Sequence, residues 1–255
     1  MKGLIITDNM KYRYICGVDL ETANLETDPE KNRILEIGAV LFDVVLQKPL
    51  EIHNVLIKPY NDIPIDPDGA RKHGITDEVL EAVGLPLLIA SNAAIGQRIV
   101  PDAFMAHNAS FDKPLLMSAG LSSPYAGIPW IDTMYDIPFP DDIKTRNLTH
   151  LAAEHGFVNP FPHRAASDVL TMVRIAAHYL ADEDAVDAVM ESAMSPVVDV
   201  IAVVNYDNRQ KAKDHKFMWD PTRKEWYKRI KECKYDPEHY DFKTRVLRDI
   251  TRTTT

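Results

Sequence analysis

The sequence predicts an α/β domain with a mixed sheet, followed by a small α+β C-terminal module. Three observations support this fold class: strand-like segments follow one another early in the chain, strand-like and helix-like segments then alternate, and a Ser-Pro pair precedes a basic segment. Consecutive strands with short links favour an antiparallel meander, and alternation with helices favours a layered α/β sheet. A chain of 255 residues can hold one large domain and an appendage.

The first three strands are expected where apolar and β-branched residues form runs or alternate with polar residues, over 13–20, 34–43 and 50–58. Thr76 suits a helix N-cap, and acidic residues follow it in the first turn. Two helices are therefore expected over 76–82 and 86–99.

The rest of the domain alternates short strands with helices. Pro114 fits only the first turn of a helix, which places the start of its helix close to Phe111, and Gly120 is expected to end it. The expected strands are 102–106 and 129–134, and the expected helices are 108–118, 147–155 and 166–181.

A domain boundary is expected at the Ser-Pro pair, which gives a domain over 1–195 and a module over 196–255. The module reads as a strand, a helix and a second strand. These cover 197–205, 208–217 and 224–230. The last residues, 251–255, are expected to be frayed.

Composition excludes several classes of protein. Hydrophobic residues make up 45% and charged residues 26% of the chain, which is typical of a globular protein and not of a collagen or a disordered chain. No apolar run is long enough to span a membrane, and the start lacks a secretion signal, so a cytoplasmic protein is expected. Cys16 is expected to be a buried, inert thiol, and with Cys233 far away the two cysteines do not form a zinc site.

Charge is unevenly distributed along the chain. The net charge is −9, but residues 1–204 carry −14 and residues 205–255 carry +5. An acidic body excludes tight, nonspecific wrapping of nucleic acid, yet it allows an enzyme that holds a few nucleotides over metal ions. The basic tail either contacts phosphates or is a solvated surface of mixed charge.

Two carboxylates lie at the end of the first strand. Asp19 and Glu21 are two residues apart, so in a strand their side chains point to the same face. Like charges that are buried together need a neutralising cation, and carboxylate oxygens suit Mg²⁺ or Mn²⁺. The alternative is that the strand has ended and that both carboxylates are solvated.

Two further segments carry acidic residues at a strand end or a helix start. Asn108 and Asp112 share a helix face, although an N-cap and a first-turn carboxylate explain them equally well. His163 lies on a proline-rich loop five residues before Asp168, where a histidine beside a metal site can take a proton from water. Ligand sites gather at such strand ends, so a coincidence of unrelated roles is improbable.

Taken together, these segments resemble the DEDD superfamily of 3′–5′ exonucleases in its histidine branch, which includes ribonuclease T, oligoribonuclease and the proofreading epsilon subunit of bacterial replicative polymerases. The resemblance covers roughly residues 13–180. His163, with Arg164 where the tyrosine branch has its tyrosine, sets the branch. The motifs, in order, are GVDLETANLE, ILEIGAVLFD, HGIT, AHNASFDKPLL, WIDTM, NLTHLAAEHGF and HRAASDV.

The resemblance implies a ribonuclease H-like fold and a site that holds two Mg²⁺ or Mn²⁺ ions. It implies His163 as general base and Glu21 as a ligand that also touches the terminal 3′-hydroxyl. The implied reaction is hydrolysis of the 3′-terminal phosphodiester of a nucleic acid to a 5′-mononucleotide. The implied metal ligands are Asp19, Glu21, Asp112 and Asp168, and the candidates for holding the last nucleotide are Leu20, Thr22, His73, Asn108 and Phe111.

The C-terminal module contains Trp219, Trp226 and Tyr227 among lysines and arginines. Aromatics between cations suit single-stranded nucleic acid, but the tryptophans can equally form the core of a small module. The module favours DNA 3′ ends as the substrate, in DNA repair or proofreading with a polymerase as a candidate partner. The alternatives are an RNA-trimming exoribonuclease or oligoribonuclease, and a nucleic-acid-binding adaptor without turnover.

Overall fold

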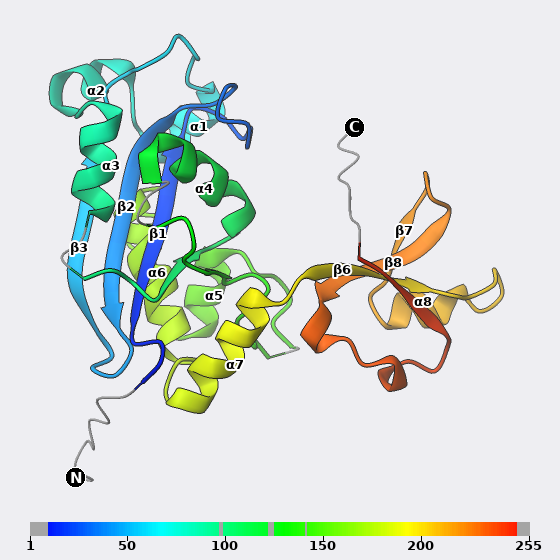
Figure 1. Cartoon of the computed structure of the whole chain (residues 1–255). Coiled ribbons are helices and arrows are strands. Elements are labelled where there is room, and N and C mark those ends of the chain that lie inside the picture. Colours follow the sequence, from blue (N-terminus) through cyan, green and yellow to red (C-terminus); the bar gives the residue numbers. More distant parts are fainter. Residues whose placement is uncertain (1–9, 97–98, 122–124, 141, 249–255) are drawn as a thin grey trace. The chain divides into compact units, whose positions relative to one another are not determined.

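The computed structural model describes residues 10–96, 99–121, 125–140 and 142–248. The chain divides into two compact units, Met1–Ala193 and Met194–Thr255 (Figure 1). The helix expected over 86–99 includes residues 97–98 near its end, and these two lie outside the described residues. The frayed end expected at 251–255 also lies outside them.

The first unit is built on a five-stranded sheet of order β3-β2-β1-β4-β5. Strand β2 pairs antiparallel with both β1 and β3, whereas β4 pairs parallel with β1 and β5 pairs parallel with β4. The predicted mixed sheet is therefore confirmed. Its strands are β1 (Tyr14–Thr22), β2 (Ile34–Asp43), β3 (Lys48–Leu56), β4 (Ala103–Ala106) and β5 (Trp130–Asp132).

Helices cover both faces of this sheet. Ile15 belongs to one apolar cluster and Cys16 to another, because successive side chains of a strand point to opposite faces. The Ile15 face packs against α5 (Leu148–Glu154), α6 (Ala165–Ala177) and α7 (Glu183–Met194). The Cys16 face packs against α3 (Leu87–Ile95) and α4 (Ala109–Leu116).

The helix with the internal proline differs from the expectation. It begins at Ala109 and not near Phe111, because Asn108 adopts a left-handed conformation with φ 75° and turns the chain directly into the helix. Pro114 then lies inside the helix, and a π-helical segment, Met117–Leu121, follows it. Proline lacks the N–H that a regular helix would bond, and the wider π turn lies directly after this interruption.

Three other helices differ from the sequence expectations. The expected helix over 166–181 ends at Ala177, since the chain leaves it at His178 and buries Leu180 in the core. A separate helix, α7, follows it and was not expected from the sequence. The short helix α1 (Pro67–His73) was also missed, whereas α2 (Asp77–Val83) begins after its Thr76 cap as expected.

The second unit has a four-stranded sheet of order β7-β8-β6-β9. The expected strand over 197–205 ends at Ala202, and the expected helix over 208–217 is shorter because Lys216 is left-handed. The short strands β7 and β9 were not expected. The elements are β6 (Val197–Ala202), α8 (Arg209–Asp214), β7 (Met218–Asp220), β8 (Glu225–Lys231), the 3₁₀ turns Glu232–Lys234 and Pro237–His239, and β9 (Thr244–Leu247).

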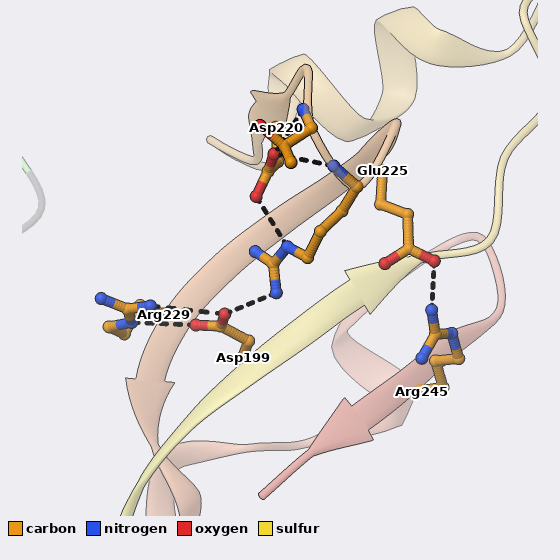
Figure 2. A network of polar contacts seen from close by, with 7 residues as sticks. Asp199, Asp220, Glu225, Arg229 and Arg245 are labelled. Atoms are coloured by element: carbon orange, nitrogen blue, oxygen red, sulfur yellow. Dashed lines mark hydrogen bonds and ion pairs between the residues drawn. The ribbon is translucent and has the colours of Figure 1, made fainter. Parts of the chain in front are cut away.

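A small apolar core and a polar network hold this second unit together. Val198, Val200 and Phe217 are buried on one side of the sheet. On β6, Asp199 accepts hydrogen bonds from Arg223 at 3.0 Å and from Arg229 at 2.9 Å (Figure 2). The buried carboxylate of this module is therefore neutralised from within the chain.

Two further expectations concern the whole chain. Cys16 lies buried in β1, and Cys233 is exposed. Among the described residues, none of the helices has the length and apolar character needed to cross a membrane.

Candidate active site

The strand β1 carries the first two carboxylates to the α6 side of the sheet. Asp19 and Glu21 follow Gly17 at alternate positions, and Gly17 lies against Val173 of α6. In the pairing with β2, Asp19 lies opposite Gly38 and Glu21 lies opposite Glu36. The regular alternation of a strand thus places two carboxylates side by side facing one helix.

A glycine in β2 lets α6 approach the sheet closely at this point. A Cβ atom at Gly38 would lie 2.4 Å from the backbone carbon of Ala165, a distance that side chains do not tolerate. Because that contact is with backbone, a larger residue would push the first turn of α6 away from the sheet. Gly38 therefore sets the distance between Asp168, in that turn, and the carboxylates of β1.

Three of the predicted ligands meet in one place. Asp19, Glu21 and Asp168 can each offer an oxygen so that these atoms all lie within 4.8 Å of one another. All three residues are half-buried. Carboxylate oxygens at this spacing are the donors that hard divalent cations such as Mg²⁺ and Mn²⁺ prefer.

Asp112 lies beside this cluster but outside the group of three. It is buried at the start of α4, and its Oδ1 accepts a hydrogen bond from the backbone N–H of Leu20 at 3.1 Å. That bond ties α4 to β1 between the two carboxylates of the strand. The negative charge of Asp112 also acts on Asp19 and raises the pKa of that carboxyl.

The electrostatics of the four carboxylates are unfavourable for ionisation. Burial, and then the charges of Asp112, Glu21 and Asp168, raise the pKa of Asp19 well above its ordinary range. Burial, and then the charge of Asp168, raise the pKa of Glu21 to about 8. Burial likewise raises the pKa of Asp112 to about 8 and shifts the pKa of Asp168 upward. Such a group becomes fully ionised at neutral pH only when a cation joins it.

Arg164, whose charge acts on Glu21, is already engaged with another acid. Arg164 forms an ion pair with Glu36, which also accepts hydrogen bonds from the Ala165 N–H at 3.0 Å and from Asn54 at 2.8 Å. Burial opposes ionisation of Glu36, but these bonds outweigh it and hold its pKa below the ordinary value. Within the described ranges, no lysine or arginine forms an ion pair with any of the four predicted ligands. The donor set therefore fits divalent cations.

The loop before α6 folds onto Asp168. The backbone N–H of His163 donates to Asp168 Oδ2 at 2.9 Å, and the side chain of Asn159 donates to Asp168 Oδ1. Asn159 is buried and also accepts a hydrogen bond from Ser167 at 2.6 Å. His163 is left-handed, with φ 64°, and its side chain is exposed. A charged imidazole here would lower the pKa of Asp168, so His163 stands next to the acidic cluster without being buried in it.

The predicted nucleotide-holding residues are placed differently from one another. Leu20 is buried in the core beside the cluster, whereas Phe111 is half-buried on α4 and packs against the same core. Thr22 donates its hydroxyl to the Asn24 carbonyl at 2.7 Å. Asn108 is exposed and accepts a hydrogen bond from Ser110 at 2.8 Å. These contacts leave ring or amide surface of Phe111 and Asn108 available to a ligand.

His73 is a buried histidine among these candidates. Its Nδ1 accepts a hydrogen bond from the Ile75 N–H at 3.0 Å, and its Nε2 has no partner in the described structure. Burial lowers the pKa of His73, and the charges of Arg164 and His163 lower it further. His73 is thus a neutral donor close to the histidine of the α6 loop.

Sequence reasoning missed three residues that shape the site. Gly38 and Glu36 lie in a segment that reads simply as a buried strand, and Asn159 lies in an irregular loop. A charged residue inside an otherwise apolar strand is a signal of a paired buried group, so Glu36 could have been found. The clearance at Gly38 and the bond from Asn159 need the folded structure.

The matches to protein-family models follow the same division of the chain. Residues 16–176 match the model described as exonuclease, and this segment contains every residue of the acidic cluster and its histidine. The chain belongs to the exonuclease family. The match confirms the resemblance to the DEDD exonucleases. Residues 200–246 match a domain of unknown function (DUF8626). A search of curated proteins found no match.

Solved structures of exonucleases share the fold. A 3′-exonuclease described in the recognition of a histone mRNA stem-loop has 17% identity and a TM-score of 0.54, and the match covers 68% of this chain and 66% of that chain. The nuclease domain of 3′hExo, described as a DEDDh family member bound to rAMP, has 18% identity and a TM-score of 0.51, with 66% and 92% covered.

Escherichia coli exonuclease I with single-stranded DNA and zinc has 17% identity and a TM-score of 0.57, with 75% of this chain and 48% of that chain covered. The chain thus spans about half the length of exonuclease I. At these identities the likeness establishes the ribonuclease H-like fold of the exonuclease domain.

Proposed function

We propose that this protein is a metal-dependent 3′–5′ exonuclease that hydrolyses the 3′-terminal phosphodiester of nucleic acid and releases 5′-mononucleotides. One observation carries the proposal: Asp19, Glu21 and Asp168 gather their oxygens within 4.8 Å of one another. The family match to an exonuclease model over the same residues supports it. An adaptor without turnover would have no physical need to hold mutually repelling carboxylates together.

In this proposal the four acidic residues would hold two divalent ions. The charges of Asp112, Glu21 and Asp168 all act on Asp19, so neutralising ions would relieve the strongest repulsion there. When bound, two Mg²⁺ or Mn²⁺ ions would neutralise the scissile phosphate and make the attacking water more acidic. Glu21 would in addition accept a hydrogen bond from the terminal 3′-hydroxyl.

The remaining roles belong to groups around the cluster. A ring nitrogen of His163 would take the proton from the attacking water, and the exposed position of the imidazole lets it pass that proton to solvent. Asn159 and the His163 N–H hold Asp168 in place. Phe111 would stack on the last base, and Thr22, His73 and Asn108 would contact the terminal nucleotide together with the Leu20 backbone.

We further propose that single-stranded DNA ends are the preferred substrate, in repair or proofreading. The basic, aromatic C-terminal module supports this preference over the short oligoribonucleotides of an oligoribonuclease. Longer RNA strands are the second candidate, since one of the similar structures is described with an mRNA stem-loop.

The test uses DNA and RNA strands of matched sequence, labelled at the 5′ end, with Mg²⁺ or with chelator. The proposal expects a ladder of products shortened from the 3′ end, release of 5′-mononucleotides, and loss of both with chelator or in Asp168→Asn. A folded parent that binds Mn²⁺ but shortens none of the strands would overturn it. Faster shortening of RNA than of DNA would replace the DNA preference with the exoribonuclease alternative.

A further inference from the structure

The C-terminal module contains a cavity that has no role in the exonuclease chemistry. Its volume is about 640 Å³, within the range of ligand-binding pockets. Its lining residues come from the end of β6 and the following loop and from α8, β7, the turn after β7, β8 and β9. Its aromatic and charged lining residues are Tyr206, Arg209, Lys213, Trp219, Lys224, Glu225, Trp226 and Arg245.

The two tryptophans of this cavity have different surroundings. Trp226 on β8 is half-buried and packs against the core of the module. Trp219 is directly opposite it on β7, with ring centroids 5.5 Å apart, yet 48% of Trp219 is exposed. Forming a core therefore accounts for Trp226 and leaves Trp219 unexplained. An exposed indole held beside a second indole offers a face on which a flat ring can stack.

The charges around this platform are mostly positive. Four cations line the cavity against one acid, Glu225, and that acid is already paired with Arg245 (Figure 2). The ammonium group of Lys213 lies 5.7 Å from the Trp226 ring, whereas Lys224 stands in the turn between β7 and β8. In the described part of the chain, neither of these two lysines forms an ion pair. The cavity thus carries uncompensated positive charge.

A third aromatic residue, Tyr206, extends the surface. Tyr206 is 76% exposed, and the Arg209 guanidinium lies 3.7 Å from the centre of its ring. The Arg209 side chain also donates to the Tyr206 carbonyl at 2.6 Å, so this cation and ring form one unit. Arginine planes and aromatic rings are both surfaces on which unpaired bases stack.

We propose that this cavity binds single-stranded nucleic acid, with an unpaired base stacked on Trp219 and adjacent phosphates held by Lys213 and Lys224. Rings among cations match the alternation of bases and phosphates along a strand, and an acidic polypeptide offers only the charge. A duplex does not fit, because its bases are already stacked inside. The inference rests on the proposed function, since it gives the enzyme a second hold on the strand that it shortens.

The test measures binding of a fluorescent strand of about 12 nucleotides by anisotropy, with the full chain and in chelator so that no hydrolysis occurs. Oligo-dT and oligo-rU form separate arms, which distinguish DNA from RNA. We expect Trp219→Leu to weaken the affinity roughly tenfold or more, and Trp219→Phe, which keeps a ring, to retain most of it. Equal affinities for the parent and Trp219→Leu would overturn the proposal.

The chain provides a matched pair of lysines for the charge. Lys224 and Lys216 are both exposed and left-handed, with φ 54° and 62°, but only Lys224 lines the cavity. Asparagine accepts this backbone conformation, so neither substitution to it strains the module. We expect Lys224→Asn to weaken binding several-fold and to flatten the dependence on salt, and Lys216→Asn to match the parent. Equal effects of the two variants would overturn the proposal, even if Trp219→Leu fails to fold.

Two further measurements separate this inference from its alternatives. A hairpin duplex that binds as tightly as the single strand, or a poly-glutamate peptide that displaces the strand, would overturn it. Cleavage by the parent with Mg²⁺ is measured separately. A parent that binds the strand through Trp219 but cleaves nothing would refute the proposed exonuclease and leave the binding site standing.

Discussion

The two units of the molecule each contain a prominent acidic group, and these two groups are neutralised in opposite ways. In the C-terminal module, Asp199 is 1% exposed and is met by two arginines, Arg223 and Arg229 (Figure 2). In the exonuclease domain, Asp19 and Asp168 share a site with other acids, and in the described residues no lysine or arginine pairs with them.

The difference shows which acidic group is complete and which is not. A carboxylate can be buried in its charged form only if something neutralises it. The module supplies that charge from its own arginines, so Asp199 is a structural group. In the described part of the exonuclease domain, no cationic side chain forms an ion pair with the acidic cluster. The pKa values of Glu21 and Asp112 are accordingly raised to about 8 each. The missing charge has to come from solution.

The largest expected effect is therefore on the incomplete group. Asp19→Asn should reduce Mg²⁺-dependent release of mononucleotides by roughly 10³-fold or more, because it removes a ligand shared by the site. Asp199→Asn is the matched control from the complete group, and on a dinucleotide substrate it should cleave at the parent rate. Similar losses in the two variants would erase the proposed distinction. The measurement is initial rate at saturating Mg²⁺.

The next effect separates binding of metal from chemistry. His163→Ala should lower the rate by roughly 10²- to 10⁴-fold, since a general base contributes about that much. Its Mn²⁺ affinity should stay at the parent value, because the side chain is exposed beside the carboxylates and is not among the group of three. A variant that cleaves as fast as the parent would exclude His163 as the base.

A smaller effect is expected at Glu36, an acid of the exonuclease domain that an arginine neutralises. Arg164→Met leaves Glu36, which is fully buried, without its cation and should lower the stability by about 1–3 kcal/mol, given that Arg164 itself reaches solvent. In the double variant with Glu36→Gln, the uncompensated charge is gone and part of the loss should return. Thermal unfolding of the three proteins measures this, and a double variant less stable than Arg164→Met would contradict it.

The smallest effect concerns the module alone. Asp199→Asn should destabilise the module by about 2 kcal/mol, because two arginines lose the negative charge and one of the two oxygens that they share but remain partly exposed. Urea unfolding followed by tryptophan fluorescence reports this, since Trp219 and Trp226 lie in the module. Unfolding at the parent urea concentration would show that the network contributes nothing to stability.

Much of this comparison could be predicted from the sequence, and the reasons are physical. Apart from Glu36 and the terminal Asp43, the strand at 34–43 is apolar, and its bounds were predicted correctly. Asp19 and Glu21 could be placed on one face from the period of a strand alone. Asp112 and Asp168 come from distant segments, and only the order of motifs brought them into the same site.

Other features depend on contacts that no local pattern encodes. The helix α1 has seven residues and a single buried side chain, His73, so it lacks an apolar periodicity. The strands β7 and β9 are three and four residues long, and they exist because they pair with longer neighbours. The clearance at Gly38 is likewise a property of two packed elements.

The central claim is that the acidic cluster is completed by divalent ions, and calorimetric titration with Mn²⁺ tests it most directly. Glu21 and Asp112, with pKa values of about 8, are largely protonated at pH 7 in the metal-free protein, so binding has to displace their protons. Run in two buffers of different ionisation enthalpy, the titration should show proton release at pH 7, less release and tighter binding above about pH 8, and greatly weakened binding in Asp19→Asn. Binding without proton release, or equal binding by Asp19→Asn, would contradict the account.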